Sequence, residues 1–364
     1  MRKKSFTAKL AAASALVAVA LAGVADDTAA AEYYDGKVLS LIVGFGPGGA
    51  DSRWRLVAPL WAKNIPGKPT VIVKNMPGAG AVKAANFVYE KAKPDGLTLY
   101  TSPWSPVGVL IKAPGIRADY SKMPLVGAMG VEIMAYARKD IVPGGITDSI
   151  QISDAPKFKM GGVRPSSPLD LLGRLSLDLM GAKYTYVPGF RGAAKMQAAV
   201  QRKETDMTNA GTSSYISKTE PTFIKTGDGH PLWYYQPANP DGSLRKFDYL
   251  EKRMPGFAAV YRKKFGKDPS GIEWEALKWL CSLIIPLTHV ALAPPGTPEE
   301  ALKALRTGFS NMAGDPEFVK ASAKAFGVPP SVVDLDQAAK LMASIADTEP
   351  RLKTFYEGYI EKAR

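Results

Sequence analysis

Short apolar runs and glycine-rich turns alternate along the first third of the chain. Residues 39–43 are an apolar run that predicts a buried strand, and residues 44–49 after it contain four glycines and a proline. A helix is predicted to begin near Asp51, whose carboxylate can cap free N–H groups in its first turn. The pattern therefore predicts a strand, a tight glycine turn and a helix N-terminus in succession.

Strands and helices continue to alternate along the rest of the sequence, which predicts a mostly parallel sheet with helices on both faces. The further predicted strands are residues 71–73, 97–101, 158–162, 184–187 and 204–209, and the further predicted helices are residues 81–93, 171–180, 193–202, 298–313 and 335–363. The predicted strands end in small, polar or glycine-rich residues. In an open α/β sheet, the carboxyl ends of the strands are where ligands bind.

The glycine turn at residues 44–49 is a candidate anion site. Backbone N–H groups at the start of a helix lack partners, and the helix dipole is positive there, so both favour a negative ligand. The alternative is that the glycines serve only the backbone geometry of a strand-to-helix turn.

The same turn fits the dinucleotide pattern G-x-G-x-x-G, but two features argue against that function. Pro47 lies inside the turn, and the strand at residues 71–73 ends in Lys74 and Asn75 instead of the acidic residue that holds a ribose. No Gly-Lys-Ser/Thr follows, which excludes a Walker phosphate loop.

Residues 1–31 have the composition of an export signal. A positively charged start precedes an apolar stretch at residues 10–22 that is too short for a comfortable membrane span. We expect cleavage after Ala31 and a periplasmic mature protein; cleavage after Ala25 and an uncleaved anchor helix are the alternatives. The single cysteine, Cys281, lies far from the signal and allows neither lipid attachment there nor a disulfide within the chain.

Charge and composition narrow the function classes. The net charge of +13 favours acidic small molecules or a negatively charged partner surface, although a merely solvated cationic surface is the alternative. Lysines and arginines are scattered without interleaved aromatic residues, so no nucleic-acid partner is expected. The only histidines are His230 and His289, and His289 is expected to be a packed residue. No catalytic residue, metal or cofactor is predicted, because no nucleophile motif or metal-ligand spacing occurs.

Several motifs occur in a fixed order along nearly the whole mature chain. They are YY-x-GK at residues 33–37, IVGFGPGG-x-D at 42–51, NMPGAG at 75–80, PDG at 94–96, GG-x-x-PSS at 161–167, GFRG at 189–192 and ALAPPGTP at 291–298. Together they resemble the solute-binding proteins of tripartite tricarboxylate transporters, also called the Bug family.

The resemblance implies an α/β, two-lobed, flytrap-like periplasmic-binding-protein fold with two crossover segments as a hinge. The first lobe would comprise residues 32–135 and 285–364, and the second lobe residues 136–284. It also implies that a small organic carboxylate is captured between the lobes, largely through loop backbone amides and ordered water. The ligand would be delivered to a membrane permease of one large and one small subunit, and the binding protein is expected to be a monomer.

The candidate ligand-binding residues lie at the predicted strand ends and in the motifs. They are Phe45, Gly46, Pro47, Gly48, Gly49, Asp51, Gly78, Ser102, Trp104, Ser166, Ser167, Phe190, Arg191, Gly192 and Thr212. Ser166 or Ser167 could instead cap the helix that follows. Arg191 is either a solvated loop charge or a planar fork for a second carboxylate.

Three questions stay open at the level of sequence. The ligand could be a di- or tricarboxylate, an aromatic acid or an acidic amino acid. The aromatic residues between residues 225 and 279 could be satellite core or a wall of the ligand pocket. A sensor module for a signalling receptor, or an enzyme acting on small organic acids, are the alternative functions.

Overall fold

The computed structural model describes residues 33–363. The predicted export signal and its cleavage after Ala31 lie outside these residues. Within residues 33–363, no helix is long and apolar enough to cross a membrane.

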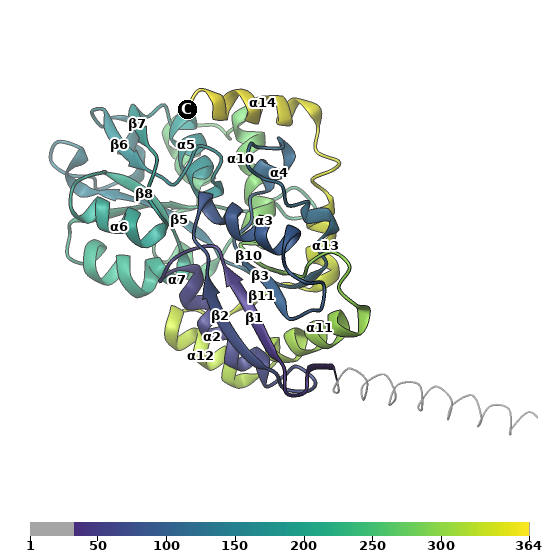
Figure 1. The fold of residues 1–364 in the computed structure, drawn as a ribbon. Helices are drawn as coiled ribbons and strands as arrows, with labels where there is room; N and C mark the ends of the chain where they lie inside the picture. Colours follow the sequence, from purple (N-terminus) through teal and green to yellow (C-terminus); the bar gives the residue numbers. More distant parts are fainter. Residues whose placement is uncertain (1–32, 364) are drawn as a thin grey trace, which may run out of the picture.

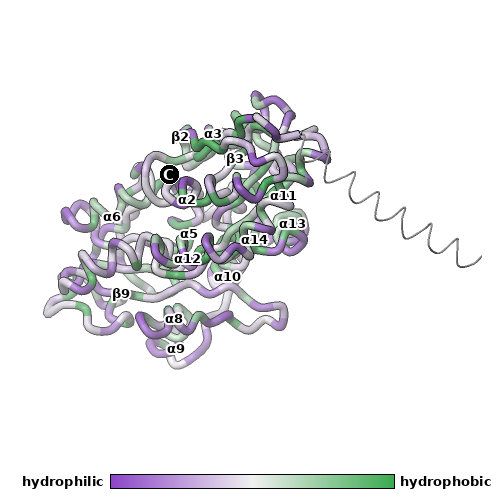
Figure 2. The backbone as a smooth tube through the Cα atoms, turned by 90° about the horizontal axis from the view of Figure 1, so that it is seen from below, coloured by the Kyte–Doolittle hydropathy of each residue, from purple (hydrophilic) through white to green (hydrophobic). Residues whose placement is uncertain are grey.

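The first lobe is built on a six-stranded sheet (Figure 1). Its strands, in the order β11-β4-β10-β3-β1-β2, are β11 (Ser331–Val332), β4 (Leu125–Gly130), β10 (His289–Leu292), β3 (Thr98–Ser102), β1 (Val38–Val43) and β2 (Thr70–Asn75). Its helices are α2 (Ala50–Ala62), α3 (Val82–Glu90), α4 (Pro106–Leu110), α11 (Glu299–Ala313), α12 (Pro316–Phe326) and α13 (Leu335–Ala343). Trp54 and Trp61 of α2 pack in one hydrophobic cluster with Phe309 of α11, whereas Val88 of α3 belongs to another. Figure 2 shows the concentration of hydrophobic residues along α3.

The second lobe is built on a five-stranded sheet. Its strands, in the order β7-β6-β8-β5-β9, are β7 (Tyr184–Val187), β6 (Phe158–Gly161), β8 (Met207–Gly211), β5 (Ile133–Arg138) and β9 (Gly229–Tyr234). Its helices are α5 (Pro168–Leu179), α6 (Ala193–Gln201), α7 (Thr212–Ser214), a π-helix (Tyr215–Ile224), α8 (Asp248–Glu251), α9 (Phe257–Phe265) and α10 (Ile272–Ile284).

Both sheets are mixed, which corrects the prediction of a mostly parallel sheet. Strands β2, β1 and β3 are parallel in the first sheet, and β7, β6 and β8 are parallel in the second. The strands that follow a crossover, β5 and β10, run antiparallel to both of their neighbours. Each enters its sheet from the other lobe instead of through a covering helix, so the rule that makes βαβ units parallel does not apply to it.

The two crossovers lie side by side and are hydrogen-bonded to each other. The N–H of Val131 donates to the carbonyl of Ile285 at 2.9 Å, and the hydroxyl of Thr288 donates to the carbonyl of Val131 at 3.2 Å. Because β5 lies wholly in the second sheet, the chain changes lobe near Val131 and Glu132, ahead of the expected boundary at residue 135.

The C-terminal helix α14 (Pro350–Glu361) packs on the second lobe, against α10, as Figure 1 shows. The phenol of Tyr356 donates to the carbonyl of Ala276 at 2.7 Å, and Arg174 of α5 donates to the carbonyl of Tyr359 at 2.8 Å. The expectation that residues 285–364 belong to the first lobe is therefore wrong for α14 alone, and the expectation that residues 335–363 form one helix is wrong. Pro350 begins a new helix, because its ring cannot fit inside a continuous one.

The segment at residues 225–279 supplies an edge strand and three helices to the second lobe. Trp233, Tyr234 and Tyr235 lie on or beside β9 and are fully buried, and Trp274 stacks on Phe257 of α9 at 6.2 Å. Their side chains pack in two hydrophobic clusters, one of which also includes residues of the first lobe, and this confirms the interpretation as core.

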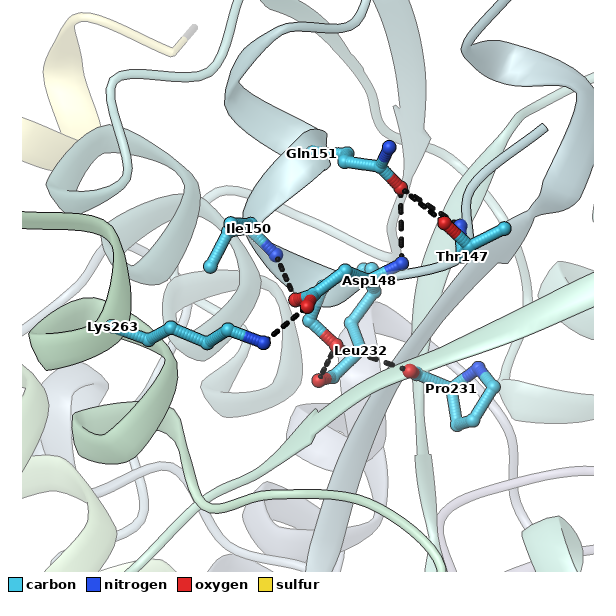
Figure 3. Close-up of polar contacts among 8 residues, drawn as sticks. Thr147, Asp148, Ile150, Gln151, Pro231, Leu232 and Lys263 are labelled. Carbon is cyan, nitrogen blue, oxygen red and sulfur yellow. Dashed lines mark hydrogen bonds and ion pairs between the residues drawn. The ribbon is translucent and has the colours of Figure 1, made fainter. Parts of the chain in front are cut away.

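A capping box fixes part of the second lobe beside this segment (Figure 3). Asp148 accepts from the N–H of Ile150 at 3.2 Å, and the side chain of Gln151 accepts from the N–H of Asp148 at 3.0 Å. Lys263 of α9 forms an ion pair with the same Asp148, which holds the pKa of that carboxyl below its usual range. The short 3₁₀ helix Ser149–Ser153 is thereby linked to α9.

We expect Asp148→Ala to lower the free energy of unfolding by about 0.5–2 kcal/mol, because the freed N–H groups lose their acceptor. Urea denaturation measures this loss. The control is Lys263→Met, which removes only an exposed ion pair and should cost less than about 0.5 kcal/mol. Equal losses in both variants would show that the ion pair, and not the cap, holds this helix.

Candidate functional site

The glycine turn connects β1 to α2 and is held close to two other loops. Gly48 (φ 102°) and Gly49 (φ 47°) adopt left-handed backbone conformations that favour glycine. The N–H of Gly44 donates to the hydroxyl of Ser102 at 2.7 Å. A Cβ atom on Gly44 would lie 2.4 Å from the Cβ of Ala81, so only glycine permits this approach.

The turn presents several unused donors. Within the described residues, the N–H groups of Phe45, Gly46, Gly48 and Gly49 donate to no protein acceptor. They lie just ahead of α2, whose aligned peptide dipoles place positive potential there. The turn can therefore accept an anion, while Pro47 has no N–H to contribute.

Asp51 does not cap α2, which corrects the prediction for this residue. The N-cap residue is Gly49, without a side-chain hydrogen bond, and the helix begins at Ala50. Asp51 is buried and accepts from Arg55 at 2.9 Å and from Asn75 at 2.8 Å. Asn75 also donates to the carbonyl of Phe45 at 2.8 Å. Asp51 therefore stabilises the glycine turn indirectly, by holding Asn75 in place.

The other first-lobe candidates divide into two groups. Gly78 (φ 156°) precedes the loop at residues 79–81 that touches the glycine turn, and Ser102 holds Gly44 directly. Trp104 instead lies buried in the hydrophobic core beside Tyr120, with ring centroids 6.1 Å apart. The structure thus brings Gly78 and Ser102 to the turn and places Trp104 in the packing around it.

In the second lobe, the loop ahead of α6 lies opposite the glycine turn. A Cβ on Gly192 would lie 3.7 Å from the Phe45 ring, and a Cβ on Gly48 would lie 3.7 Å from the Cβ of Ala194. The N–H of Phe190 is already used by the carbonyl of Gly162.

Arg191 lies in this loop, and its side chain is exposed. It makes no hydrogen bond or ion pair within the part of the chain that the structure describes. Its role as a fork for a second carboxylate stays a prediction.

Ser166 and Ser167 are buried at the start of α5. Ser167 occupies the N-cap position without a capping hydrogen bond from its side chain. The carbonyl of Ser166 accepts from the hydroxyl of Ser105 in the first lobe at 3.2 Å, so this loop also touches the other lobe.

Asp170, in the first turn of α5, orders the loop ahead of that helix. It accepts from the N–H groups of Val163 and Arg164 at 2.6 and 2.8 Å. Burial raises the pKa of its carboxyl to about 6.

Thr212 is hydrogen-bonded to Glu132, at the first crossover between the lobes. Its hydroxyl lies 2.9 Å from the carbonyl and 3.1 Å from the carboxylate of Glu132. The neighbouring Ser213 accepts from Arg53 of α2 at 3.1 Å, which joins the lobes next to the crossovers.

Arg53 and Arg164 are charged residues at the boundary between the lobes that the sequence analysis did not single out. Arg53 is buried under the ring of Phe326 at 4.5 Å, and burial lowers its pKa to about 10. Arg164 reaches from the second lobe to Gly80 in the first. Arg164 follows the carboxyl end of β6 and lies inside the GG-x-x-PSS motif, and this position could have marked it as a candidate site residue.

We also searched the described residues for metal-binding clusters and surface hollows. The described residues contain no group of three or more side chains that could hold a metal ion. A surface hollow of about 780 Å³ lies between Arg138, Lys203 and Phe223 in the second lobe. None of the predicted site residues lines it.

Comparisons with known proteins bear on this arrangement. No family model matches the chain. The chain is 25% identical over 302 residues to a UPF0065 protein of Bordetella pertussis, an alignment that covers 82% of this chain and 83% of that protein. Among solved structures, it is similar to the periplasmic binding protein BugD, with a TM-score of 0.65 and 18% identity over 90% of this chain and 98% of that one.

Two similar structures are described with ligands. One is Rpa4515 of R. palustris with adipate, with a TM-score of 0.65 and 18% identity over 90% of this chain and 97% of that one. The other is MatC of Rhodopseudomonas palustris with bound malate, with a TM-score of 0.62 and 17% identity over 89% of this chain and 99% of that one. The resemblance to the Bug-type binding proteins is confirmed. The two-lobed periplasmic-binding-protein fold is confirmed as well.

His289, at the start of β10, is packed as expected. It lies against the ring of Trp54, with centroids 6.4 Å apart, and its Nδ1 has no partner within the described residues. Burial, and then the nearby charge of Arg53, lower its pKa well below the usual 6.5.

We expect His289 to make stability depend on pH. The imidazole stays neutral in the folded protein and takes up a proton on unfolding below its ordinary pKa of 6.5, so acid favours the unfolded chain. In urea denaturation, the wild type should lose stability relative to His289→Gln as the pH falls from about 7.5 to about 5. Parallel pH profiles of the two proteins would contradict this assignment.

Proposed function

We propose that the chain is an extracytoplasmic solute-binding protein that captures a small organic carboxylate between its lobes. It would deliver this ligand to the permease subunits of a tripartite tricarboxylate-type transporter and act as a monomer in the periplasm. The observation that carries the proposal is the glycine turn. Its free N–H groups lie at the start of α2, and the second lobe meets the turn at Gly192 and Ala194.

The chemistry of the boundary supports a carboxylate ligand. Backbone N–H groups and a helix N-terminus favour a negative group without needing a charged side chain beside it. The similar structures described with malate and adipate hold dicarboxylates. Binding without chemical conversion agrees with two similar structures, which are named as a periplasmic binding protein and a solute binding protein.

We expect Gly48→Val and Gly49→Val to abolish carboxylate binding, because a β-branched residue cannot keep the left-handed conformation that positions the donors. Calorimetry with acids found in a thermal-shift screen measures the loss. The strain should also cost about 1–2 kcal/mol of stability.

Gly36→Val is the control, since Gly36 also has a positive φ (65°) and lies in the turn ahead of β1. It should cost similar stability and leave affinity unchanged. Wild-type affinity in either turn variant would remove this stretch from the site.

We also expect ligand to bring the lobes together. The contacts of Arg53 with Ser213 and of Ser105 with Ser166 can form only when the lobes meet. Small-angle scattering should therefore show a smaller radius of gyration with saturating ligand than without it. An acid that does not raise the melting temperature serves as the control compound. An unchanged scattering curve with binding proven by calorimetry would contradict closure.

A further inference from the structure

Arg164 carries a partly buried positive charge across the boundary between the lobes. It belongs to the loop between β6 and α5 in the second lobe. A Cβ atom on Gly80 of the first lobe would lie 2.9 Å from its Nε and 3.4 Å from its Cζ. The side chain therefore rests against the loop that precedes α3.

This guanidinium has no ion-paired or hydrogen-bonded counterion among the described residues. Its Nε is inaccessible to solvent and has no hydrogen-bond partner there, and the side chain forms no ion pair with any of them. Burial lowers the pKa of Arg164, but an arginine remains charged in proteins. A desolvated charge is costly unless a partner of opposite sign is present.

The carboxylate of Asp170 does not fill this role. Its Oδ2 accepts from the N–H groups of Val163 and Arg164 and from the phenol of Tyr186 at 2.6 Å. It therefore binds the backbone of Arg164; its charge favours the charged form of the guanidinium, but the two side chains form no hydrogen bond or ion pair. The arginines that are fully buried differ, since Arg53 donates to Ser213 and Arg174 donates to two carbonyl oxygens.

Arg164 and the glycine turn flank the same short loop. Gly44 approaches Ala81 on one side of this loop, and Gly80 approaches Arg164 on the other. Two groups that favour negative charge are thus separated by only a few residues of backbone. One consists of backbone N–H groups, and the other is a planar fork that suits a carboxylate.

We infer that Arg164 binds the second carboxylate of a dicarboxylate whose first carboxylate occupies the glycine turn. This inference rests on the proposed function and adds the ligand class to it. The second carboxylate of the ligand would supply an ion-paired counterion to the guanidinium. Because the site is partly desolvated, this pairing is stronger than a surface ion pair.

Calorimetry with matched pairs of acids tests the inference. The probes are succinate, malate and adipate, each compared with the monocarboxylate of equal chain length: butyrate, 3-hydroxybutyrate and hexanoate. Arg164→Gln should weaken the dicarboxylate that binds the wild type by roughly ten- to a hundredfold. It should weaken the matching monocarboxylate by less than about threefold, because the monocarboxylate has no second group to lose. Arg164→Lys should restore part of the affinity, since it returns the charge but not the fork.

Melting temperatures without ligand separate binding from a structural role. Removing an uncompensated, partly buried charge should leave the melting temperature of Arg164→Gln equal to that of the wild type or higher. The control is Arg202→Gln, an exposed arginine of the same lobe that pairs with Glu204. It should bind both acids of each pair as the wild type does.

Three outcomes would overturn the inference. The first is a lower melting temperature with equal losses for both acids of a pair. The second is an unchanged dicarboxylate affinity in Arg164→Gln. The third is a selective dicarboxylate loss in Arg191→Gln alone, which would assign the second carboxylate to Arg191. If the wild type binds none of the acids and no other carboxylate in the thermal-shift screen, the proposed function itself fails; if it binds only monocarboxylates, the inference alone fails.

Discussion

The hydrogen bond between the N–H of Val131 and the carbonyl of Ile285 joins the two segments through which the chain passes between lobes. The strand that follows each crossover, β5 or β10, is an interior strand of its sheet, with neighbours on both sides. Thr288 and Thr212 add side-chain hydrogen bonds on either side of this backbone hydrogen bond. These two short segments, hydrogen-bonded to each other, fix where the lobes meet. If the lobes move relative to each other, only the few backbone φ and ψ angles in these segments need to change.

Positively charged side chains and backbone N–H groups lie at the boundary between the lobes. The glycine turn contributes positive backbone potential from the first lobe, and Arg164 contributes a cation from the second. Arg53, nearer the crossovers, is a further buried cation. A carboxylate lies near each arginine: burial lowers the pKa of both, whereas Glu132 raises that of Arg53 and Asp170 raises that of Arg164. The unused N–H groups of the turn have no such partner among the described residues, and the proposed carboxylate ligand would supply one.

Two buried carboxylates near this boundary are held by hydrogen bonds that order the loops. Asp51 is held by Arg55 and Asn75 behind the glycine turn, and Asp170 is held by backbone N–H groups and Tyr186. Each acid orders a loop through these hydrogen bonds. This arrangement separates the residues that shape the site from those that would hold the ligand.

The sequence by itself determined the local elements of the first lobe and their order. The apolar run before the glycines became β1, and the residues at 97–101 became β3 within one position, because strand pattern and turn chemistry act over a few residues. The motifs were also sufficient for the family resemblance and the two-lobed fold. The unused N–H groups of the glycine turn could be predicted because they belong to one contiguous stretch of backbone.

Only the tertiary structure decided which elements meet. The spacing of hydrophobic residues along α14 does not indicate that this helix packs on α10 of the second lobe. An amphipathic helix pattern specifies which face is buried but not which element covers it. The roles of Asp51 and Trp104 depended in the same way on neighbours distant in sequence. Arg164 is the clearest case, because an arginine in a loop is ordinarily solvated. Its missing counterion matters only because the first lobe covers its Nε, and burial by another lobe is a long-range property that no local pattern encodes.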